Sequence, residues 1–242
     1  MSPTSSPQQT AATAIAPGRL FISGAWHDST DGARMDVISP ATGSKITDVA
    51  KATTTDVDAA VAAAREAFDG GQWAGLSPRE RGRILLKVHD LMRERVEDLA
   101  QAESQNVGKP IMLARVVDVN NAAETFEYYA TLGEQLDGAV RQTPGNTHAV
   151  VRREPVGVVA AITPFNFPLI LSSSKIAPAL LAGNTIVHKP ASDTPLSALL
   201  MAEILRDAGV PDGVYNVITG AGSELGDHLV THPDVNKIAF TG

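Results

Sequence analysis

The sequence predicts an α/β fold in which a parallel, Rossmann-like sheet follows an N-terminal part of strands and helices. After residue 156, short apolar runs and helical segments alternate three times and end on a strand, which is typical of a doubly wound parallel sheet. The run Val156–Thr163 is almost continuously apolar, as expected of a strand that is covered on both faces. Of the 242 residues, 43% are hydrophobic, which is enough to bury such a sheet.

The chain is expected to begin with a disordered tail and three short strands. Residues 1–18 are rich in Ser, Thr, Pro and Gln and lack a long apolar stretch, which is typical of disorder. Alternating apolar residues bounded by turn residues then predict strands at Leu20–Ile22, Asp36–Ser39 and Lys45–Val49.

Three helices are predicted next. Thr55 is taken as the cap of the first helix, and Asp56 falls in its first turn. Ser77 starts the second, because Pro78 suits the first helical position and Glu80 completes a capping box. The third is expected to run from Pro110 towards residue 136. Residues 137–154 break the helical pattern and predict a β-hairpin around a Pro-Gly-Asn turn.

The C-terminal part supplies the sheet and its crossover helices. Right-handed crossovers place the carboxyl ends of all parallel strands on one edge, where ligands bind. The predicted strands are Val156–Thr163, Thr185–His188, Val214–Ile218 and Lys237–Phe240, and the helices are Ser172–Leu181, Pro195–Ala208 and Ser223–Val230.

Composition narrows the function classes. A formal charge of −7 and a pI of about 5.3 argue against a nucleic-acid or anionic-membrane surface. There is no cysteine, so these residues contain no disulfide, thiolate metal site or catalytic thiol. No apolar run reaches the roughly 18–20 residues of a membrane span, and the first 18 residues lack the cations of a targeting signal. We expect a cytoplasmic protein.

A motif whose residues could bind a ligand or take part in a reaction follows each of the four predicted strands. A lone Gly-x-Gly is weak evidence, and the spacing here is G-x-G-x-x-x-G after the third strand, which differs from the dinucleotide fingerprint. The meeting of the four motifs at one edge of the sheet is more informative than any single motif. The four motifs are Thr163–Pro168, Lys189–Ser192, Gly220–Gly226 and Phe240–Gly242.

Together these segments resemble the cofactor-binding domain of the aldehyde dehydrogenase superfamily. The resemblance over Val156–Gly242 is carried by Pro164–Pro168, Ala179–Thr185, Lys189–Ser192, Gly209–Val214, Gly222, Gly226 and Ile238–Gly242. The earlier residues are similar more loosely, through Asn106–Pro110 and the hairpin. The resemblance implies that residues 19–242 form an NAD(P)-binding domain, with residues 137–154 as an oligomerisation arm. The family's C-terminal catalytic domain, with its cysteine nucleophile and general-base glutamate, is not contained in these residues.

The resemblance also implies a reaction, namely oxidation of an aldehyde to a carboxylic acid by NAD(P)⁺ through a cysteine thiohemiacetal. Asn166 occupies the place of the asparagine whose amide holds the oxyanion, and such a donor is worth roughly 3–4 kcal/mol in a transition state. From the residue alone, Asn166 could instead cap the next helix or order a turn.

The remaining site residues follow from the same resemblance. Lys189 would bind the adenosine ribose hydroxyls, although a lone lysine is more often solvated. Ser192 stands where many NAD-preferring members carry Glu, so NADP or both cofactors would be accepted. The expected contacts are Ile162, Thr163, Pro164 and Phe165 at the nicotinamide side, Gly222 and Gly226 at the adenine side, and Phe240 and Gly242 at the pyrophosphate.

No metal site is expected. His228 and His232 have the spacing of metal ligands, but Leu229 replaces the glutamate of the HExxH motif. The 242 residues are expected to be inactive alone and to belong to a homo-oligomer in a full-length form. The alternatives are a non-catalytic nucleotide-binding chain and a fragment that docks on an intact subunit.

Overall fold

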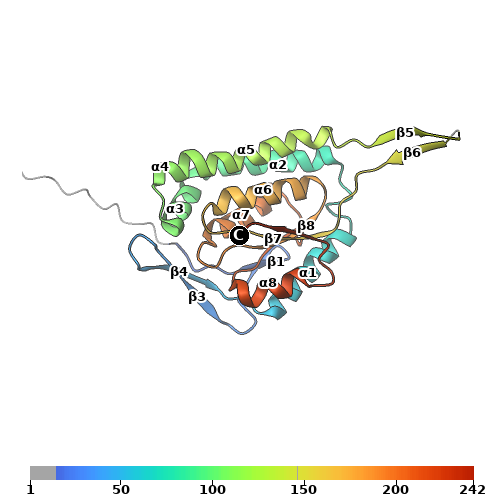
Figure 1. Cartoon of the computed structure of the whole chain (residues 1–242). Helices are drawn as coiled ribbons and strands as arrows, with labels where there is room; N and C mark the ends of the chain where they lie inside the picture. The colour runs from blue at the N-terminus through green and yellow to red at the C-terminus, as the bar shows by residue number, and fades with distance from the viewer. Residues whose placement is uncertain (1–14, 146) are drawn as a thin grey trace, which may run out of the picture.

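The computed structural model describes residues 15–145 and 147–242, and its centre is a six-stranded sheet with the order β10-β7-β8-β9-β1-β2 (Figure 1). Residues 1–14 of the predicted tail, and Asn146 of the predicted hairpin turn, lie outside the described residues. Gly18, at the end of the predicted tail, forms a parallel bridge with Val49. The sheet strands are β1 (Leu20–Ile22), β2 (Ala25–His27), β7 (Val158–Ile162), β8 (Thr185–Lys189), β9 (Tyr215–Val217) and β10 (Lys237–Phe240).

The four predicted parallel strands are confirmed, since β10, β7, β8 and β9 pair in parallel. The sheet continues with β1 and β2, which pair antiparallel and were not expected to join it. Ser23 and Gly24 connect them with positive φ angles of 51° and 77°, the conformation of a tight hairpin turn. Asn216 of β9 holds this turn, because its Oδ1 accepts a hydrogen bond of 2.9 Å from the Ser23 amide.

Two further pairs of strands lie outside this sheet. β3 (Arg34–Ile38) pairs with β4 (Lys45–Ala50), as the turn-bounded sequence predicts. β5 (Ala139–Thr143) and β6 (Thr147–Val151) form the predicted hairpin. Every described residue of β5 and β6 is exposed, and the hairpin projects away from the body of the molecule (Figure 1).

The first two helices begin at local caps. The capping box of α1 (Thr54–Asp69) is formed by Thr53 and Asp56, so the prediction of Thr55 as the cap was wrong by two residues. Both threonines lie three residues before an acidic side chain, Asp56 for Thr53 and Asp58 for Thr55, so local spacing does not distinguish them. Asp56 also accepts hydrogen bonds from Thr30, a tertiary contact that the local pattern does not report. α2 (Pro78–Glu94) begins at Ser77 as predicted, and Arg95 separates it from α3 (Val96–Val107).

The predicted third helix is a continuous helical run with a wider turn inside it. It comprises α4 (Ile111–Leu113), the π-helical turn η1 (Ala114–Val119), α5 (Asn120–Thr131) and the 3₁₀ turn η2 (Leu132–Glu134). The crossover helices are α6 (Pro168–Leu181), α7 (Leu196–Ala208) and α8 (Gly222–Val230). α6 therefore begins four residues before the predicted Ser172, because Pro168 occupies the first helical position.

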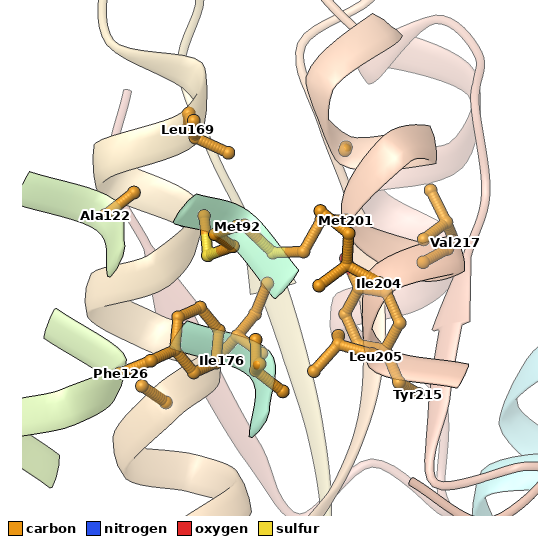
Figure 2. Packing of buried hydrophobic residues seen from close by; sticks show 14 of the residues in the cluster. Met92, Ala122, Phe126, Leu169, Ile176, Met201, Ile204, Leu205, Tyr215 and Val217 are labelled. Atoms are coloured by element: carbon orange, nitrogen blue, oxygen red, sulfur yellow. The ribbon is translucent and has the colours of Figure 1, made fainter. Parts of the chain in front are cut away.

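Helices cover both faces of the sheet. α6 and α7, backed by α2 and α5, lie on one side, whereas α1 and α8 lie on the other (Figure 1). The alternation in β7 matches these layers, because Val159 and Ala161 belong to the larger core while Val158 and Ala160 face the smaller one. Figure 2 shows the larger core, where Met92, Phe126 and Ile176 pack with residues of α7 and β9.

Candidate functional site

The carboxyl ends of the parallel strands meet as the sequence predicts. The pairing register places Phe240 beside Ile162, and Ile162 beside Lys189. The alignment continues past the strands, since the Thr163 amide donates to the Lys189 carbonyl at 3.2 Å. Ile162 is half-buried and Thr163 is buried, whereas Phe240 is 62% exposed. The edge therefore combines buried polar groups with an exposed aromatic ring.

Lys189 is a buried cation at this edge. Its residue is only 3% exposed, and its Nζ donates to the Pro190 carbonyl at 3.3 Å. No carboxylate among residues 15–145 and 147–242 forms an ion pair with it, and burial lowers the pKa of the ammonium. A buried lysine with little protein hydrogen bonding retains donors for a ligand. This excludes the solvated surface lysine that was the alternative for this residue.

The Gly-rich segment lies against Lys189. A methyl group added at Gly222 would approach the Lys189 Nζ to 3.9 Å, and one added at Gly226 would meet no atom within 4 Å. Ser192 is half-buried, and its hydroxyl donates to the Gly220 carbonyl at 2.9 Å. Gly222 thus lies close to the Lys189 ammonium at the exposed start of α8, and Ser192 contacts the same Gly-rich segment through Gly220.

The loop between β7 and α6 carries Asn166 at the surface. Phe165 is 62% exposed and Phe167 is 40% exposed, with Pro164 half-buried between the loop and the strand. The N-cap of α6 is Phe167, which makes no side-chain cap, and no described residue hydrogen-bonds the Asn166 side-chain amide. Asn166 therefore does not cap the helix, and its amide is available to a ligand. Gly242 lies near the Phe240 ring, because an added methyl would approach that ring to 3.0 Å.

A buried group of charges behind this loop was missed by the sequence reasoning. Lys109 Nζ contacts the Asp118 carboxylate and lies 3.5 Å from Glu103 Oε2. It also donates to the Asn166 carbonyl at 3.3 Å. Asp118 lies four residues from both Ala114 and Ala122, on the buried face of its helix. An acidic residue within an apolar helical stripe is the signal that could have revealed this group.

A second buried polar group joins the strands beneath the edge. His188 Nε2 lies 3.0 Å from the Thr163 hydroxyl and 3.3 Å from the Ser172 hydroxyl, while Nδ1 lies 2.7 Å from the Tyr215 hydroxyl. Burial, with the nearby charges of Lys189 and Lys175, lowers the pKa of His188 to about 3. Tyr215 stays protonated, because burial raises its pKa well above the usual range. With both groups uncharged, one hydrogen bond joins Nδ1 to the Tyr215 hydroxyl, and the hydroxyls of Thr163 and Ser172 face Nε2.

The histidine pair on the opposite side contacts a carboxylate. His228 Nε2 lies 2.6 Å from Asp58 Oδ1, and His232 Nε2 lies 3.5 Å from the same oxygen. Within the described ranges, no group of three or more His, Cys, Asp or Glu side chains is arranged to hold a metal ion. In the same part of the chain, no helix has both the length and the apolar character that crossing a bilayer requires.

Known proteins resemble this chain in sequence and fold. The model of the aldehyde dehydrogenase family matches residues 26–242. Cytosolic 10-formyltetrahydrofolate dehydrogenase of Xenopus tropicalis is 43% identical over 230 residues, which are 93% of this chain and 26% of that protein. The NADP/NAD-dependent aldehyde dehydrogenase PuuC of Escherichia coli (strain K12) is 41% identical over 224 residues, covering 93% of this chain and 45% of that protein.

A solved structure agrees with these matches. PnpE in complex with nicotinamide adenine dinucleotide has 47% sequence identity and a TM-score of 0.90, over 93% of this chain and 46% of that one. The chain thus spans less than half the length of each of these three relatives. Sequence and fold agree over nearly all of its described residues, and the chain belongs to the aldehyde dehydrogenase family.

Proposed function

We propose that this chain forms the cofactor-binding part of an enzyme that oxidises an aldehyde to a carboxylic acid with NAD⁺ or NADP⁺ through a cysteine thiohemiacetal. The observation that carries the proposal is Lys189, a buried ammonium at the edge where the parallel strands end. Its charge has no carboxylate partner in the described part of the chain, so a polar ligand compensates for its burial.

The surroundings of Lys189 fit a dinucleotide. Gly222 and Gly226 leave room above α8 for the adenosine, and Lys189 would donate to the ribose hydroxyls. Ser192 is small and uncharged, and its hydroxyl is directed at the Gly220 carbonyl, so nothing at this position repels a 2′-phosphate. We therefore propose that NADP⁺ is accepted as well as NAD⁺. Phe240 and Gly242 would lie beside the pyrophosphate.

The other end of the cofactor would lie against Ile162, Thr163, Pro164 and Phe165, where it accepts a hydride when bound. Asn166 would donate its side-chain amide to the oxyanion formed from the aldehyde, a role that its exposed and unengaged amide supports. The 242 residues contain no cysteine, so none of them can provide the thiolate. We accordingly expect no aldehyde oxidation from these residues by themselves.

Calorimetric titration of the chain with NAD⁺ and NADP⁺ tests the cofactor proposal. Lys189→Met should weaken both dinucleotides about 10- to 100-fold, since a charge-assisted hydrogen bond contributes roughly 1.5–3 kcal/mol. The exposed Lys87 on α2 gives a matched control, and Lys87→Met should leave both affinities unchanged. Ser192→Glu should weaken NADP⁺ more than NAD⁺. If neither NAD⁺ nor NADP⁺ binds, the proposal is refuted.

The assembly and location of the protein are proposed on separate observations. Val140, Val150 and Val151 are exposed on the β5–β6 hairpin, which suits an arm that pairs with another copy of the chain. Light scattering of the intact chain and of a variant without residues 138–153 should show a smaller assembly for the variant. We propose a cytoplasmic location, in line with a relative whose name describes it as cytosolic; cell fractionation tests this.

A further inference from the structure

The loop that carries Asn166 is held at two points by side chains from outside it. Lys109 Nζ donates to the Asn166 carbonyl at 3.3 Å. Glu103 Oε1 accepts the Leu169 amide at 3.2 Å, three residues further along. These two contacts bracket Phe167, whose ring centroid lies 4.5 Å from the Lys109 ammonium. The backbone around the proposed oxyanion donor is therefore fixed by residues that belong to a different part of the fold.

Glu103 supplies the hydrogen-bond acceptor at the start of α6 that the preceding loop does not supply. Phe167 occupies the N-cap and makes no side-chain hydrogen bond, so the first amides of α6 lack a local acceptor. The Glu103 carboxylate of α3 takes this place, and a negative charge is favourable at a helix N-terminus. Burial raises the pKa of Glu103 above its usual value, and neither Ser197 nor the Lys109 charge, which both act in the opposite direction, outweighs it.

Lys109 is itself held firmly. Its side chain is 8% exposed, and those of Glu103 and Asp118 are completely buried. Gly108 precedes it with φ of 81° and ends α3, and the Lys109 carbonyl accepts the Ser104 hydroxyl at 2.8 Å. Asp118 lies in the π-helical turn η1, a type of turn that frequently marks functional sites. The backbone of Lys109 and its ammonium are thus both held in place by neighbouring residues.

The arrangement contains more buried acceptors than charge neutralisation needs. Two carboxylates face one ammonium, and both Glu103 Oε2 and Asp118 Oδ1 lack a hydrogen-bond partner among the described residues. Such a group is costly to bury. If the lysine only neutralised the carboxylates, its donors would all be directed at them, yet one of them is directed at the Asn166 carbonyl.

We propose that Lys109, held by Asp118 and Glu103, is the positioning residue for Asn166, fixing the backbone from which the side-chain amide points at the oxyanion. This proposal rests on the proposed function of Asn166. Lys109 acts through the Asn166 carbonyl and does not touch the reacting atoms. Because the loop is exposed and its side-chain amide makes no described protein contact, the backbone anchor sets where that amide lies.

Backbone ¹⁵N relaxation of the intact 242-residue chain tests the anchor directly. In the wild type, the order parameter of the Asn166 backbone N–H should be about 0.85, the value of a rigid backbone. Lys109→Met should lower it below about 0.6, while residues in the strands keep their values. A lysine that only stabilised the fold would change the melting temperature without this selective loss of order at Asn166.

Lys45→Met is the matched control. Lys45 Nζ on the β3–β4 pair also contacts two carboxylates, Asp36 at 2.7 Å and Asp48 at 2.9 Å, but its side chain is 47% exposed. This variant should leave the order parameter of Asn166 unchanged. Should Lys109→Met fail to fold, Asp118→Asn decides the matter, because it keeps the size of the side chain but removes the charge that holds the ammonium.

An unchanged order parameter at Asn166 in Lys109→Met, or in Asp118→Asn where the first variant does not fold, would overturn the proposal. An equal loss of order in Lys45→Met would overturn it too, because the loss would then not depend on this anchor. The readout reports the loop alone, so it remains valid whether or not Asn166 binds an oxyanion. Failure of the cofactor titration would refute the proposed function and leave the loop measurement to be judged separately.

Discussion

His188 should make the stability of this protein depend on pH in a specific direction. In the unfolded chain its imidazole titrates at its usual pKa of 6.5, whereas in the folded chain the pKa lies at about 3. Between these values the unfolded state binds more protons than the folded state. Stability must therefore fall as the pH is lowered through this window, and it is fully recovered above it.

The size of the effect follows from these two pKa values. Each pH unit well inside the window costs about 1.4 kcal/mol, so lowering the pH from 7.5 to 5.0 should remove about 2 kcal/mol of stability. Urea unfolding of the wild type and of His188→Gln at both pH values measures this, because other titrating groups contribute equally to both proteins. The stability difference between the two proteins should shrink by about 2 kcal/mol at pH 5.0.

A control and a direct observation complete this test. His148 lies on the exposed hairpin, so His148→Gln should leave the pH dependence of stability unchanged. In NMR spectra, the His188 ring resonances should not move between pH 8 and pH 5. A midpoint near 6.5 for this ring, or a wild-type-to-variant difference that is constant with pH, would show that His188 is protonated in the fold.

Three further substitutions test the scaffold by urea unfolding. Arg81→Met should lower the free energy of unfolding by about 3–5 kcal/mol. The buried guanidinium donates to the carbonyls of Leu181 (2.8 Å), Ala74 (3.3 Å) and two others. A decrease under about 1 kcal/mol would contradict this. Gly82→Ala should cost about 1–3 kcal/mol, because the added methyl would lie 2.7 Å from the Ala130 carbonyl; equal stability would show that α5 gives way freely. Burial alone would raise the pKa of Asp56, but hydrogen bonds from Thr30 and Thr53 outweigh it and lower the pKa. Asp56→Asn should therefore cost about 1–3 kcal/mol at pH 7, with a gap that narrows only as the pH falls below 3.8; a gap that already closes at pH 5 would refute the lowered pKa.

Local signals predicted much of this fold. Ser77, Pro78 and Glu80 lie within four residues of one another, so the start of α2 could be identified from the sequence. The four parallel strands were recognised because they are apolar and separated by helices of ordinary length. The strand Ala25–His27 was missed because it is too short to show alternation and, unlike Leu20–Ile22, is not an apolar run. Its pairing also depends on a turn held by a distant residue, Asn216.

The candidate site, too, could be predicted only in part from the sequence. Lys189 and Phe240 could be placed at one edge because strand ends follow from the topology. The anchor of Asn166 could not, since Glu103 and Asp118 lie 63 and 48 residues earlier in the chain and reach the loop only through tertiary packing. The position of Asp118 on an apolar helical stripe could indicate a buried charge, but periodicity does not report which distant residues that charge contacts.

The antiparallel edge formed by β1 has a consequence for synthesis. The contact between Ser23 and Asn216 spans 193 residues, so the first strand leaves the ribosome long before its neighbour exists. At roughly 5–20 residues per second, the delay is about 10–40 s. During that time β1 is a short apolar segment with no partner from β9, open to other chains. The order of synthesis thus makes the N-terminal hairpin wait for β9 before it can join the sheet, although it is the first part of the sheet to be made.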